Sequence, residues 1–407
     1  MSDLRTRSRD KSDRKEFSKT PFQAVQVIAI SFGHMVHDVY SSFLAPLIPL
    51  LVEKLGIPLS LAGMLDVVKS SPSLINPLLG YIVDRAKVKY FVIFAPAVTT
   101  VIMSLVGIAP SYIIVVVMIF VMGVNSTLFH IPSPVLIKNL SGDRIGLGMS
   151  FYMLGGELSR SISPLIITGA VTMWGLEGTW RLIPFGLAAS LVLFYFLRDY
   201  EPEENQSRQM KSKSETRFWS GLGRLFSSIG AYLLFVMALK ISVTLYLPAY
   251  LVAKGESLVS ASLMLAVLQF SGAVGTMVSG AVSDRIGRKT ILYLAGIACP
   301  VLMYLFLRFD GSFTYPLLSL LGFFLFAYGP VLLAMIQGED HVSPSFVNGV
   351  YMTVTFFIRS LIVFLVGHYV EAIGFEITYY IAAAAAVGVI PCIYFMPADR
   401  PKQVSGK

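Results

Sequence analysis

Apolar segments of about twenty residues or more recur along almost the whole chain and alternate with short polar stretches. An α-helix of that length spans a lipid bilayer, because it satisfies its own backbone hydrogen bonds where water is absent. Charged residues make up only 14% of the sequence, against about 25% in a typical soluble domain. We therefore predict an all-α integral membrane protein.

Apolar runs between loop signals predict twelve transmembrane helices. The expected spans are 22–52, 59–83, 90–108, 112–138, 146–173, 181–198, 228–252, 258–283, 290–307, 313–337, 345–370 and 375–396. A polar stretch divides them into two groups of six. The predicted organisation is a basic tail (1–21), an N-terminal bundle (22–198), a linker (199–227), a C-terminal bundle (228–396) and a second tail (397–407).

The distribution of lysine and arginine predicts the orientation, because cytoplasmic loops carry an excess of basic residues. The N-terminal tail holds Arg5, Arg7, Arg9, Lys11, Arg14, Lys15 and Lys19, whereas the loops assigned to the outside hold one each: Lys54, Arg181, Lys254 and Arg308. Both termini and the linker are therefore expected in the cytoplasm, in a multi-pass plasma membrane protein of the bacterial inner membrane type. The net charge of +8 follows from this topology and gives no reason to expect nucleic acid as a partner.

A repeated hexapeptide indicates that the chain consists of two related halves. GYIVDR at 80–85 returns as GAVSDR at 280–285, an offset of 200 residues. Offsets of 199 or 200 also match residues inside the spans: Pro49 with Pro248, Lys69 with Gln269, and Arg160 with Arg359. Parallel repeats related by an axis along the membrane normal place a substrate site near mid-membrane between them. The repeat thus predicts two pseudo-symmetric six-helix bundles and membrane transport.

The doubled Gly-x-x-x-Asp-Arg motif, with basic residues after it, resembles the loop signature of the major facilitator superfamily. The second copy includes Gly287 and is nearly complete, whereas the first has Lys87 where glycine is usual. Other motifs resemble the fosmidomycin-resistance branch: Gly33-His34, Asp38-Val39-Tyr40, Phe129-His130-Ile131-Pro132, and Gly155-Gly156 before Pro164. The resemblance covers nearly the whole chain beyond residue 20. It implies a secondary transporter that works by alternating access.

Two interpretations of the repeated loops remain open. The plainer one is a pair of solvated turns that set the topology. The resemblance implies the other, a gate in which an aspartate caps the N-terminus of a helix from the opposite half. The gating residues would be Asp84, Arg85, Asp284, Arg285 and Arg288.

Charged side chains inside the predicted spans are costly in lipid and are usually functional or paired. Two i,i+3 pairs, Asp66 with Lys69 and Glu157 with Arg160, can form local salt bridges, which is the structural alternative to a functional role. Lys240 and Arg359 have no acid within four residues on their own helix. The mid-membrane set carries one excess positive charge: Lys69, Arg160, Lys240 and Arg359 against Asp38, Asp66 and Glu157.

The matched Arg160 and Arg359 predict the substrate class. Two guanidinium groups from opposite halves suit a carboxylate, phosphate or phosphonate, which arginine binds in a bidentate manner. We therefore expect a small-molecule substrate that is anionic or zwitterionic. The expected binding residues are Arg160, Arg359, Lys240, Lys69, Tyr40, Tyr152 and His130.

Coupling to protons is a second expectation. A carboxylate in a membrane cavity exchanges protons when a conformational change alters its partner. Asp38 and Glu157 are the first candidates and Asp66 is the third. His37 and His130 could relay protons, although a lone histidine in a helical bundle is more often a neutral hydrogen-bonding residue.

Other function classes find no support in the sequence. Cys299 and Cys392 both fall inside apolar runs, so neither a disulfide nor a metal site is expected. No nucleophile–base spacing and no nucleotide-binding loop indicates an enzyme, a cofactor or primary transport. The prediction is a monomeric transporter that exports a small organic anion or drug-like amphiphile in exchange for protons. Proton-coupled import of such an anion and a non-transporting membrane sensor are the alternatives.

Overall fold

The computed structural model describes residues 21–75, 89–142, 145–200, 219–337 and 344–396, and every regular element in these ranges is helical. The N-terminal half contains α1 (Ala24–Ser41), α2 (Leu44–Leu55), α3 (Leu59–Ser70), η1 (Ser71–Ile75), α5 (Lys89–Leu105), η2 (Val106–Ile108), α6 (Tyr112–His130), α7 (Ser133–Leu140), α8 (Ile145–Trp174), η4 (Leu176–Leu182) and α9 (Ile183–Leu197). The C-terminal half contains α10 (Trp219–Thr244), α11 (Leu247–Ala253), α12 (Leu258–Ile286), α13 (Arg288–Arg308), η6 (Gly311–Phe313), α14 (Thr314–Phe326), α15 (Tyr328–Gln337), α16 (Pro344–Ile373), α17 (Phe375–Ala386) and α18 (Val389–Phe395).

Ten helical segments of the described chain are long and apolar enough to cross a membrane. Two further predicted spans correspond to α8 and α3. Helix α8 has 30 residues, but it is rich in glycine and serine and carries Glu157 and Arg160. Helix α3 is followed by η1 and then by residues outside the described ranges. The prediction of a twelve-helix membrane protein is consistent with this arrangement.

Some helix boundaries differ from the predicted spans. The span predicted at 22–52 consists of α1 and α2, and the span predicted at 112–138 consists of α6 and α7. Pro132 lies between α6 and α7, where a residue without a backbone N–H interrupts the helical hydrogen bonds. Helix α10 begins at Trp219, so helical structure extends back into the segment predicted as a linker (199–227).

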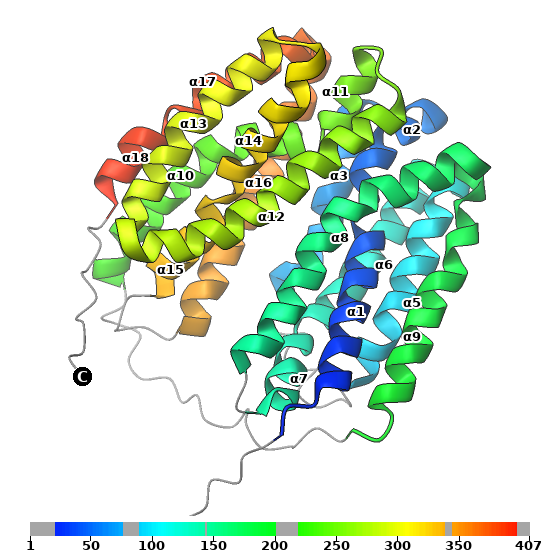
Figure 1. The fold of residues 1–407 in the computed structure, drawn as a ribbon. Helices are drawn as coiled ribbons and strands as arrows, with labels where there is room; N and C mark the ends of the chain where they lie inside the picture. The colour runs from blue at the N-terminus through cyan, green and yellow to red at the C-terminus, as the bar shows by residue number, and fades with distance from the viewer. Residues whose placement is uncertain (1–20, 76–88, 143–144, 201–218, 338–343, 397–407) are drawn as a thin grey trace, which may run out of the picture.

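The two halves lie side by side and meet along matched helices (Figure 1). Within the halves, α1 packs against α5, α8 and α9, and α10 packs against α16, α17 and α18. Between the halves, α8 packs against α12, α3 against α16, and α2 against α11. The offset of about 200 residues relates α3 to α12 and α8 to α16, so the first two of these contacts are equivalent.

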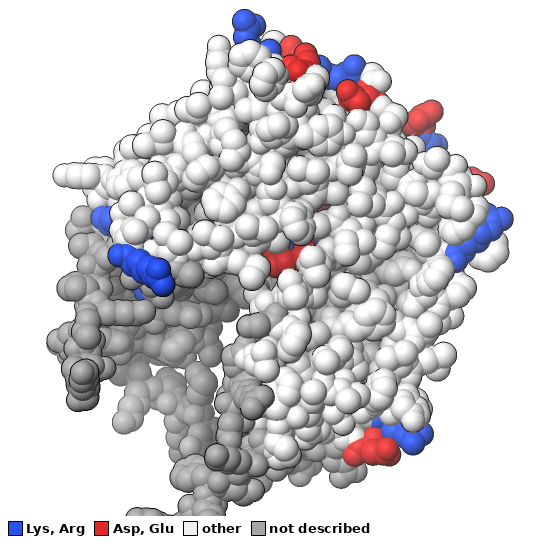
Figure 2. All heavy atoms as spheres, in the orientation of Figure 1, with Lys and Arg blue, Asp and Glu red and all other residues white. Residues whose placement is uncertain are grey.

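The described chain begins and ends on the same side of the molecule (Figure 1). Two hydrogen bonds at this side each join residues of the same half: Gln23 N donates to Leu140 O, and Lys289 Nζ donates to Met396 O. The halves diverge toward this side, which we call the open side, and Figure 2 shows the surface hollowed between them there. The halves meet on the opposite, closed side, where α2 lies against α11.

The outer surface between the two ends of the molecule is apolar. Large side chains such as Ile113, Met173 and Tyr394 are more than 70% exposed. Figure 2 shows most charged groups at the rims of the visible face, with a broad, largely uncharged surface between them that holds one small acidic patch. Such a surface is suited to lipid, which offers no partner for a charge.

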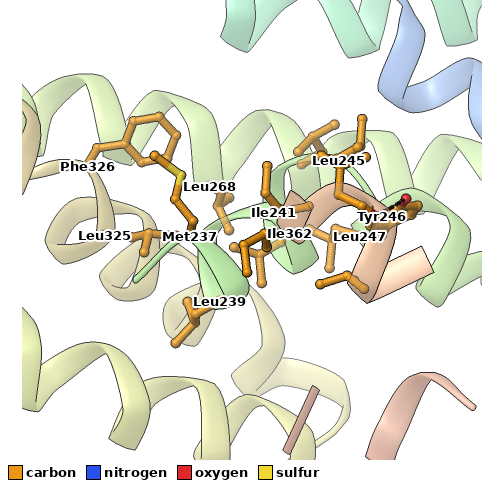
Figure 3. Close-up of a cluster of buried hydrophobic side chains, with 14 of the residues drawn as sticks. Met237, Leu239, Ile241, Leu245, Tyr246, Leu247, Leu268, Leu325, Phe326 and Ile362 are labelled. Carbon is orange, nitrogen blue, oxygen red and sulfur yellow. Dashed lines mark hydrogen bonds between the residues drawn. The ribbon is translucent and has the colours of Figure 1, made fainter. Parts of the chain in front are cut away.

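A buried hydrophobic core joins the two halves on the closed side. It includes Leu47 and Leu65 from the N-terminal half and Tyr246, Leu247 and Ile362 from the C-terminal half. Figure 3 shows part of this core, with Tyr246 beside Leu245 and Leu247. Because this core closes one side, the polar residues next to it form a pocket between the halves.

Candidate substrate-binding cavity

A cavity of about 260 Å³ lies between the halves. Five charged residues line it: Asp66 and Lys69 from α3, Arg160 from α8, Lys240 from α10, and Arg359 from α16. Gln269 of α12, the counterpart of Lys69 in the repeat, also lines it. The structure therefore brings both predicted arginines and both predicted lysines to one place.

The strongest ion pair in the cavity crosses between the halves. Arg359 donates to Oδ2 of Asp66 from Nε at 2.8 Å and from Nη2 at 2.6 Å. The Asp66 side chain is only 4% exposed, and its other oxygen lies 3.7 Å from Lys69 Nζ. The local i,i+3 pair expected from the sequence is therefore the longer contact, and the main partner of Asp66 comes from the other half.

Arg160 keeps the partner that its helical spacing predicts. Its Nη2 lies 3.2 Å from Oε1 of Glu157, one turn earlier in α8, and its side chain is 41% exposed. Pro164 also lines the cavity and interrupts α8 next to this pair. Because proline has no N–H, the carbonyl of Arg160 lacks its usual helical donor at this point. Arg160 therefore lies where one backbone hydrogen bond of α8 is missing, next to the cavity.

Lys240 is held by aromatic rings and not by an acid. Its Nζ lies 4.5 Å from the ring centre of Phe326 and 4.8 Å from that of Tyr328, and it donates to the Tyr328 hydroxyl at 3.1 Å. In the part of the chain that the structure describes, no carboxylate lies within ion-pair distance of Lys240. Ring faces attract a cation only moderately, so Lys240 keeps positive charge available for an anion.

The charges around the cavity are unequal. The cations Lys69, Arg160, Lys240 and Arg359 face Asp66 in the lining and Glu157 behind Arg160. This gives an excess of two positive charges among these residues. The sequence predicted an excess of one because it counted Asp38, whose carboxylate is bound elsewhere.

Asp38 belongs to a separate hydrogen-bonded cluster within the N-terminal half. Its Oδ2 lies 3.2 Å from His34 Nε2, and its Oδ1 lies 3.2 Å from His130 Nε2. Tyr152 stacks on His34, with ring centres 3.9 Å apart. A side chain at Gly156 would collide with His34, so the glycine pair of α8 makes room for this cluster.

His34 contacts an oxygen through each of its ring nitrogens. Its Nδ1 lies 2.9 Å from the backbone oxygen of Tyr152, which can only accept, so Nδ1 carries a proton. Nε2 of the same ring lies 3.2 Å from Asp38 Oδ2. The two ring nitrogens of His34 therefore face two different oxygens, one of a backbone carbonyl and one of a carboxylate.

A metal ion is an alternative explanation of the same cluster. The ligand atoms of His34, Asp38 and His130 lie within 4.8 Å of one another. The two imidazoles, however, meet different oxygens of one carboxylate at 3.2 Å, which is the arrangement of two hydrogen bonds. Hydrogen bonding accounts for this geometry without a metal.

Two further predicted site residues, His37 and Tyr40, also lie outside the cavity lining. His37 is fully buried, with Nδ1 2.8 Å from the Thr99 hydroxyl and Nε2 3.3 Å from the Ser126 hydroxyl. These two hydroxyl groups satisfy both nitrogens of a neutral imidazole, which fits the interpretation of His37 as a neutral hydrogen-bonding residue. Tyr40 is 4% exposed and donates to Leu182 O at 2.7 Å, which makes it part of the packing of the N-terminal half.

Tyr152 and His130 lie in the Asp38 cluster and not in the cavity lining. Tyr152 is 5% exposed, and its hydroxyl lies 3.3 Å from His130 Nδ1. His130 is the more accessible of the two, with 39% of its side chain exposed. Both were predicted to bind substrate, but the structure places them in contact with the Asp38 cluster.

The predicted gating residues are only partly covered by the structure. Asp84 and Arg85 lie outside the described residues, as does the side chain of Asp284. Arg285 is exposed at the end of α12, and Arg288 is half-buried at the start of α13. The gate at these loops therefore stays a prediction.

Sequence reasoning missed several residues around the cavity. Phe326 and Thr244 line it, although neither is distinguishable in the sequence from the many other residues of its kind. The Asp66–Arg359 pair had a partial signal, because an arginine without an acid on its own helix needs a partner from elsewhere. Which acid fills that role depends on the packing of α3 against α16.

Comparison with known proteins agrees with this architecture. Residues 30–363 match the family model of the Major Facilitator Superfamily. A fosmidomycin resistance protein of Escherichia coli (strain K12) is 26% identical over 386 residues, which cover 92% of this chain and 93% of that protein. The resemblance to that branch is thereby confirmed.

Solved structures share the fold at low sequence identity. A D-xylose–proton symporter superposes with a TM-score of 0.73 at 14% identity, covering 94% of this chain and 100% of the other. The nucleoside transporter NupG superposes with a TM-score of 0.70 at 15% identity, covering 92% and 100%. Since the family model spans most of the sequence and the helices adopt the same fold, the chain belongs to the major facilitator superfamily.

Proposed function

We propose that this transporter carries a small organic anion through the cavity between its halves by alternating access. One observation carries the proposal: four cations from both halves line the cavity, and only Asp66 among the lining residues opposes them. Burying such an excess in a membrane is costly unless an anion offsets it. A carboxylate or phosphonate is the group that these cations would recognise.

Each cation has a distinct part in this proposal. Arg160 and Arg359 approach from opposite halves and would grip the anionic group or groups of the substrate. Lys240 has no carboxylate partner among the described residues and would supply charge at mid-cavity. Phe326, which packs against Lys240, gives an apolar surface for the rest of an amphiphilic molecule.

We further propose that protons drive the transport, with Asp38 as the first candidate for the coupling group. The contact between His34 and Asp38 supports this role, because a carboxylate beside an imidazole can bind or release a proton when a conformational change alters their contact. His130 connects the cluster to a more accessible position. Glu157 and Asp66 remain the second and third candidates, since each is already paired with a base.

Export in exchange for protons is the favoured direction, and import with protons is the alternative. The name of the fosmidomycin resistance protein favours export, because resistance is commonly achieved by removing a compound from the cell. We propose that both termini lie in the cytoplasm of a plasma membrane, as the basic N-terminal tail favours, so that the open side faces inward. We propose a monomer without nucleic acid partners. A sensor without transport activity would gain nothing from a half-buried Lys240 that has no carboxylate partner among the described residues.

Flux measurements in proteoliposomes test the proposal. A pH gradient is imposed, and organic anions including the phosphonate fosmidomycin are screened while substrate flux and internal pH are recorded together. Flux opposite to the proton flow identifies antiport, and flux with it identifies symport. If Arg160→Ala and Arg359→Ala both left the transport of every organic anion intact, the anion assignment would be wrong.

A matched control separates loss of the cavity charge from loss of folding. Arg181 lies outside the cavity and stacks on Trp174 and Trp180, so Arg181→Ala should transport normally. Absence of flux for every anion, in a protein that is folded and correctly inserted, would favour the sensor.

A further inference from the structure

Helices α3 and α16 form a polar seam on the closed side, and its inner end lies in the cavity. The inner contact is Asp66 with Arg359. In the middle, Tyr246 of the C-terminal half packs against Gly63 of α3, and its hydroxyl donates to Val363 O within its own half at 3.0 Å. The outer contact is Glu371, whose Oε1 accepts a hydrogen bond from Ser60 N at 2.5 Å. We use the term seam for these contacts only.

The spacing of the residues explains why the contacts follow one another. On α3, Ser60, Gly63 and Asp66 are three residues apart, and on α16, Arg359, Val363, Gly367 and Glu371 are four apart. Residues three or four apart share one face of a helix. Residue numbers fall along α3 and rise along α16 from the cavity toward the outer end of the seam, so the two helices are antiparallel. Their facing sides are in contact along this whole length.

Glycines allow the middle of the seam to close. A side chain at Gly63 or at Gly367 would collide with the Tyr246 hydroxyl. Tyr246 is fully buried within the core that joins the halves. The closed side thus depends on close contact of Tyr246 with the two glycines. Any increase in the separation of α3 and α16 would break this contact.

Glu371 stabilises the outer end of the seam through the N-terminus of α3. The N–H of Ser60 is in the first turn of that helix, where backbone donors have no partner within the helix. A carboxylate at this position also interacts favourably with the helix dipole. This cap crosses between the halves, so it exists only while the closed side is closed.

We propose that Asp66 occupies, in the empty transporter, the place that the substrate's anionic group takes on Arg359. This inference rests on the proposed function and extends it. The Nε and Nη2 donors of Arg359 both point at Asp66 Oδ2, so an anion can reach that edge only by displacing Asp66. The displaced carboxylate keeps Lys69 as a partner on its own helix.

Displacement of Asp66 would open the seam from its inner end. Arg359 belongs to α16 and Asp66 to α3, so the exchange of partners removes the charged link between the halves at the cavity. The remaining contacts across the seam are the packing of Tyr246 against Gly63 and one exposed cap. A substrate without a negative charge would bind without releasing the seam, which makes Asp66 a determinant of specificity.

Distance measurements without substrate test the seam by itself. Spin labels at Glu53 and Glu256, both exposed on the closed side, report the separation of the halves in nanodiscs after Cys299 and Cys392 are replaced by alanine. We expect Asp66→Asn to shift the distribution to longer distances, and Glu371→Gln to shift it less. The charge-swapped double variant, Asp66→Arg with Arg359→Asp, should restore the short distance.

The control is a charge on the same side that joins only one half. Glu177 pairs with Lys54 within the N-terminal half, so Glu177→Gln should leave the distance unchanged. An unchanged distance in Asp66→Asn, or an equal shift in Glu177→Gln, would overturn the inference whether or not the protein transports anions.

Binding provides the second measurement. If the carboxylate competes with the substrate, Asp66→Asn should bind fosmidomycin about tenfold more tightly than the parent protein while transporting it more slowly. Fosmidomycin should also lengthen the label distance in the parent protein. If the parent protein transports fosmidomycin and Asp66→Asn binds it with the same affinity as the parent, the competition is refuted. The proposed function would still stand in that case.

Discussion

Arg359 and Asp66 lie 293 residues apart in the sequence, yet Nη2 of the arginine is 2.6 Å from Oδ2 of the aspartate. The contact joins α16 to α3 and therefore the C-terminal half to the N-terminal half. It is formed inside the cavity, where the substrate is proposed to bind. A residue pair in this position links the occupancy of the cavity to the relative placement of the halves.

Replacing Arg359 with lysine should weaken anion binding although the positive charge is kept. Lysine cannot reproduce the paired donors that arginine directs at one anionic group. Loss of one charge-assisted hydrogen bond costs about 2 kcal/mol, which is about thirtyfold in affinity. Equilibrium binding of fosmidomycin to the purified variant checks this. Equal affinity for Arg359→Lys and the parent protein would show that geometry at this residue does not matter.

Replacing Lys240 with methionine should stabilise the protein and impair transport. Methionine removes a cation that has no carboxylate partner among the described residues while it retains contact with the Phe326 ring. We expect the thermal midpoint to rise by an amount equivalent to about 1 kcal/mol. Lys254→Met is the matched control, because Lys254 pairs with exposed Asp310 outside the cavity. A lower midpoint for Lys240→Met would contradict this view of the cavity.

Asp38→Asn should uncouple transport from the pH gradient. Asparagine cannot bind and release a proton as the Asp38 carboxylate beside His34 can. Exchange of labelled for unlabelled substrate should persist, whereas accumulation against a gradient should disappear. Both rates can be measured in the same proteoliposomes. Unchanged gradient dependence in both Asp38→Asn and Glu157→Gln would rule out either carboxylate as the coupling group.

Gly63→Ala should destabilise the closed side by about 1–3 kcal/mol, because the added methyl group collides with the Tyr246 hydroxyl. Tyr246→Phe removes that hydroxyl, so the double variant should recover part of the lost stability. The thermal midpoints of the two single variants and the double variant give the coupling between the residues. Simple additivity of the two effects would mean that the residues do not meet in the folded protein.

Much of the fold could be predicted because lipid imposes one simple rule on the sequence. Uninterrupted apolar runs must become helices, and the repeat of about 200 residues relates α3 to α12 and α8 to α16. The breaks between α1 and α2 and between α6 and α7 were not predicted. An apolar run gives no sign of a change in helix direction within it, and Pro132 was a visible but ambiguous signal.

The site could be predicted as a set of residues but not as a set of partners. Arg160 and Arg359 reach one cavity because the repeat relates their helices. Helical spacing also correctly paired Glu157 with Arg160. It could not reveal that Asp66 prefers Arg359 to Lys69, or that Asp38 lies between two histidines from different helices. Those contacts depend on the approach of helices that are distant in sequence.

The positive excess of the cavity has an electrical consequence. Where the cell interior is negative, each charge gains about 2.3 kcal/mol per 100 mV by being connected to the interior. The resting potential would therefore hold the empty carrier open toward the cytoplasm, ready to load cargo for export. A dianionic cargo would cancel the two excess charges, and the loaded carrier would turn outward without opposition from the voltage. The charge of the cargo would then decide which half of the transport cycle responds to the membrane potential.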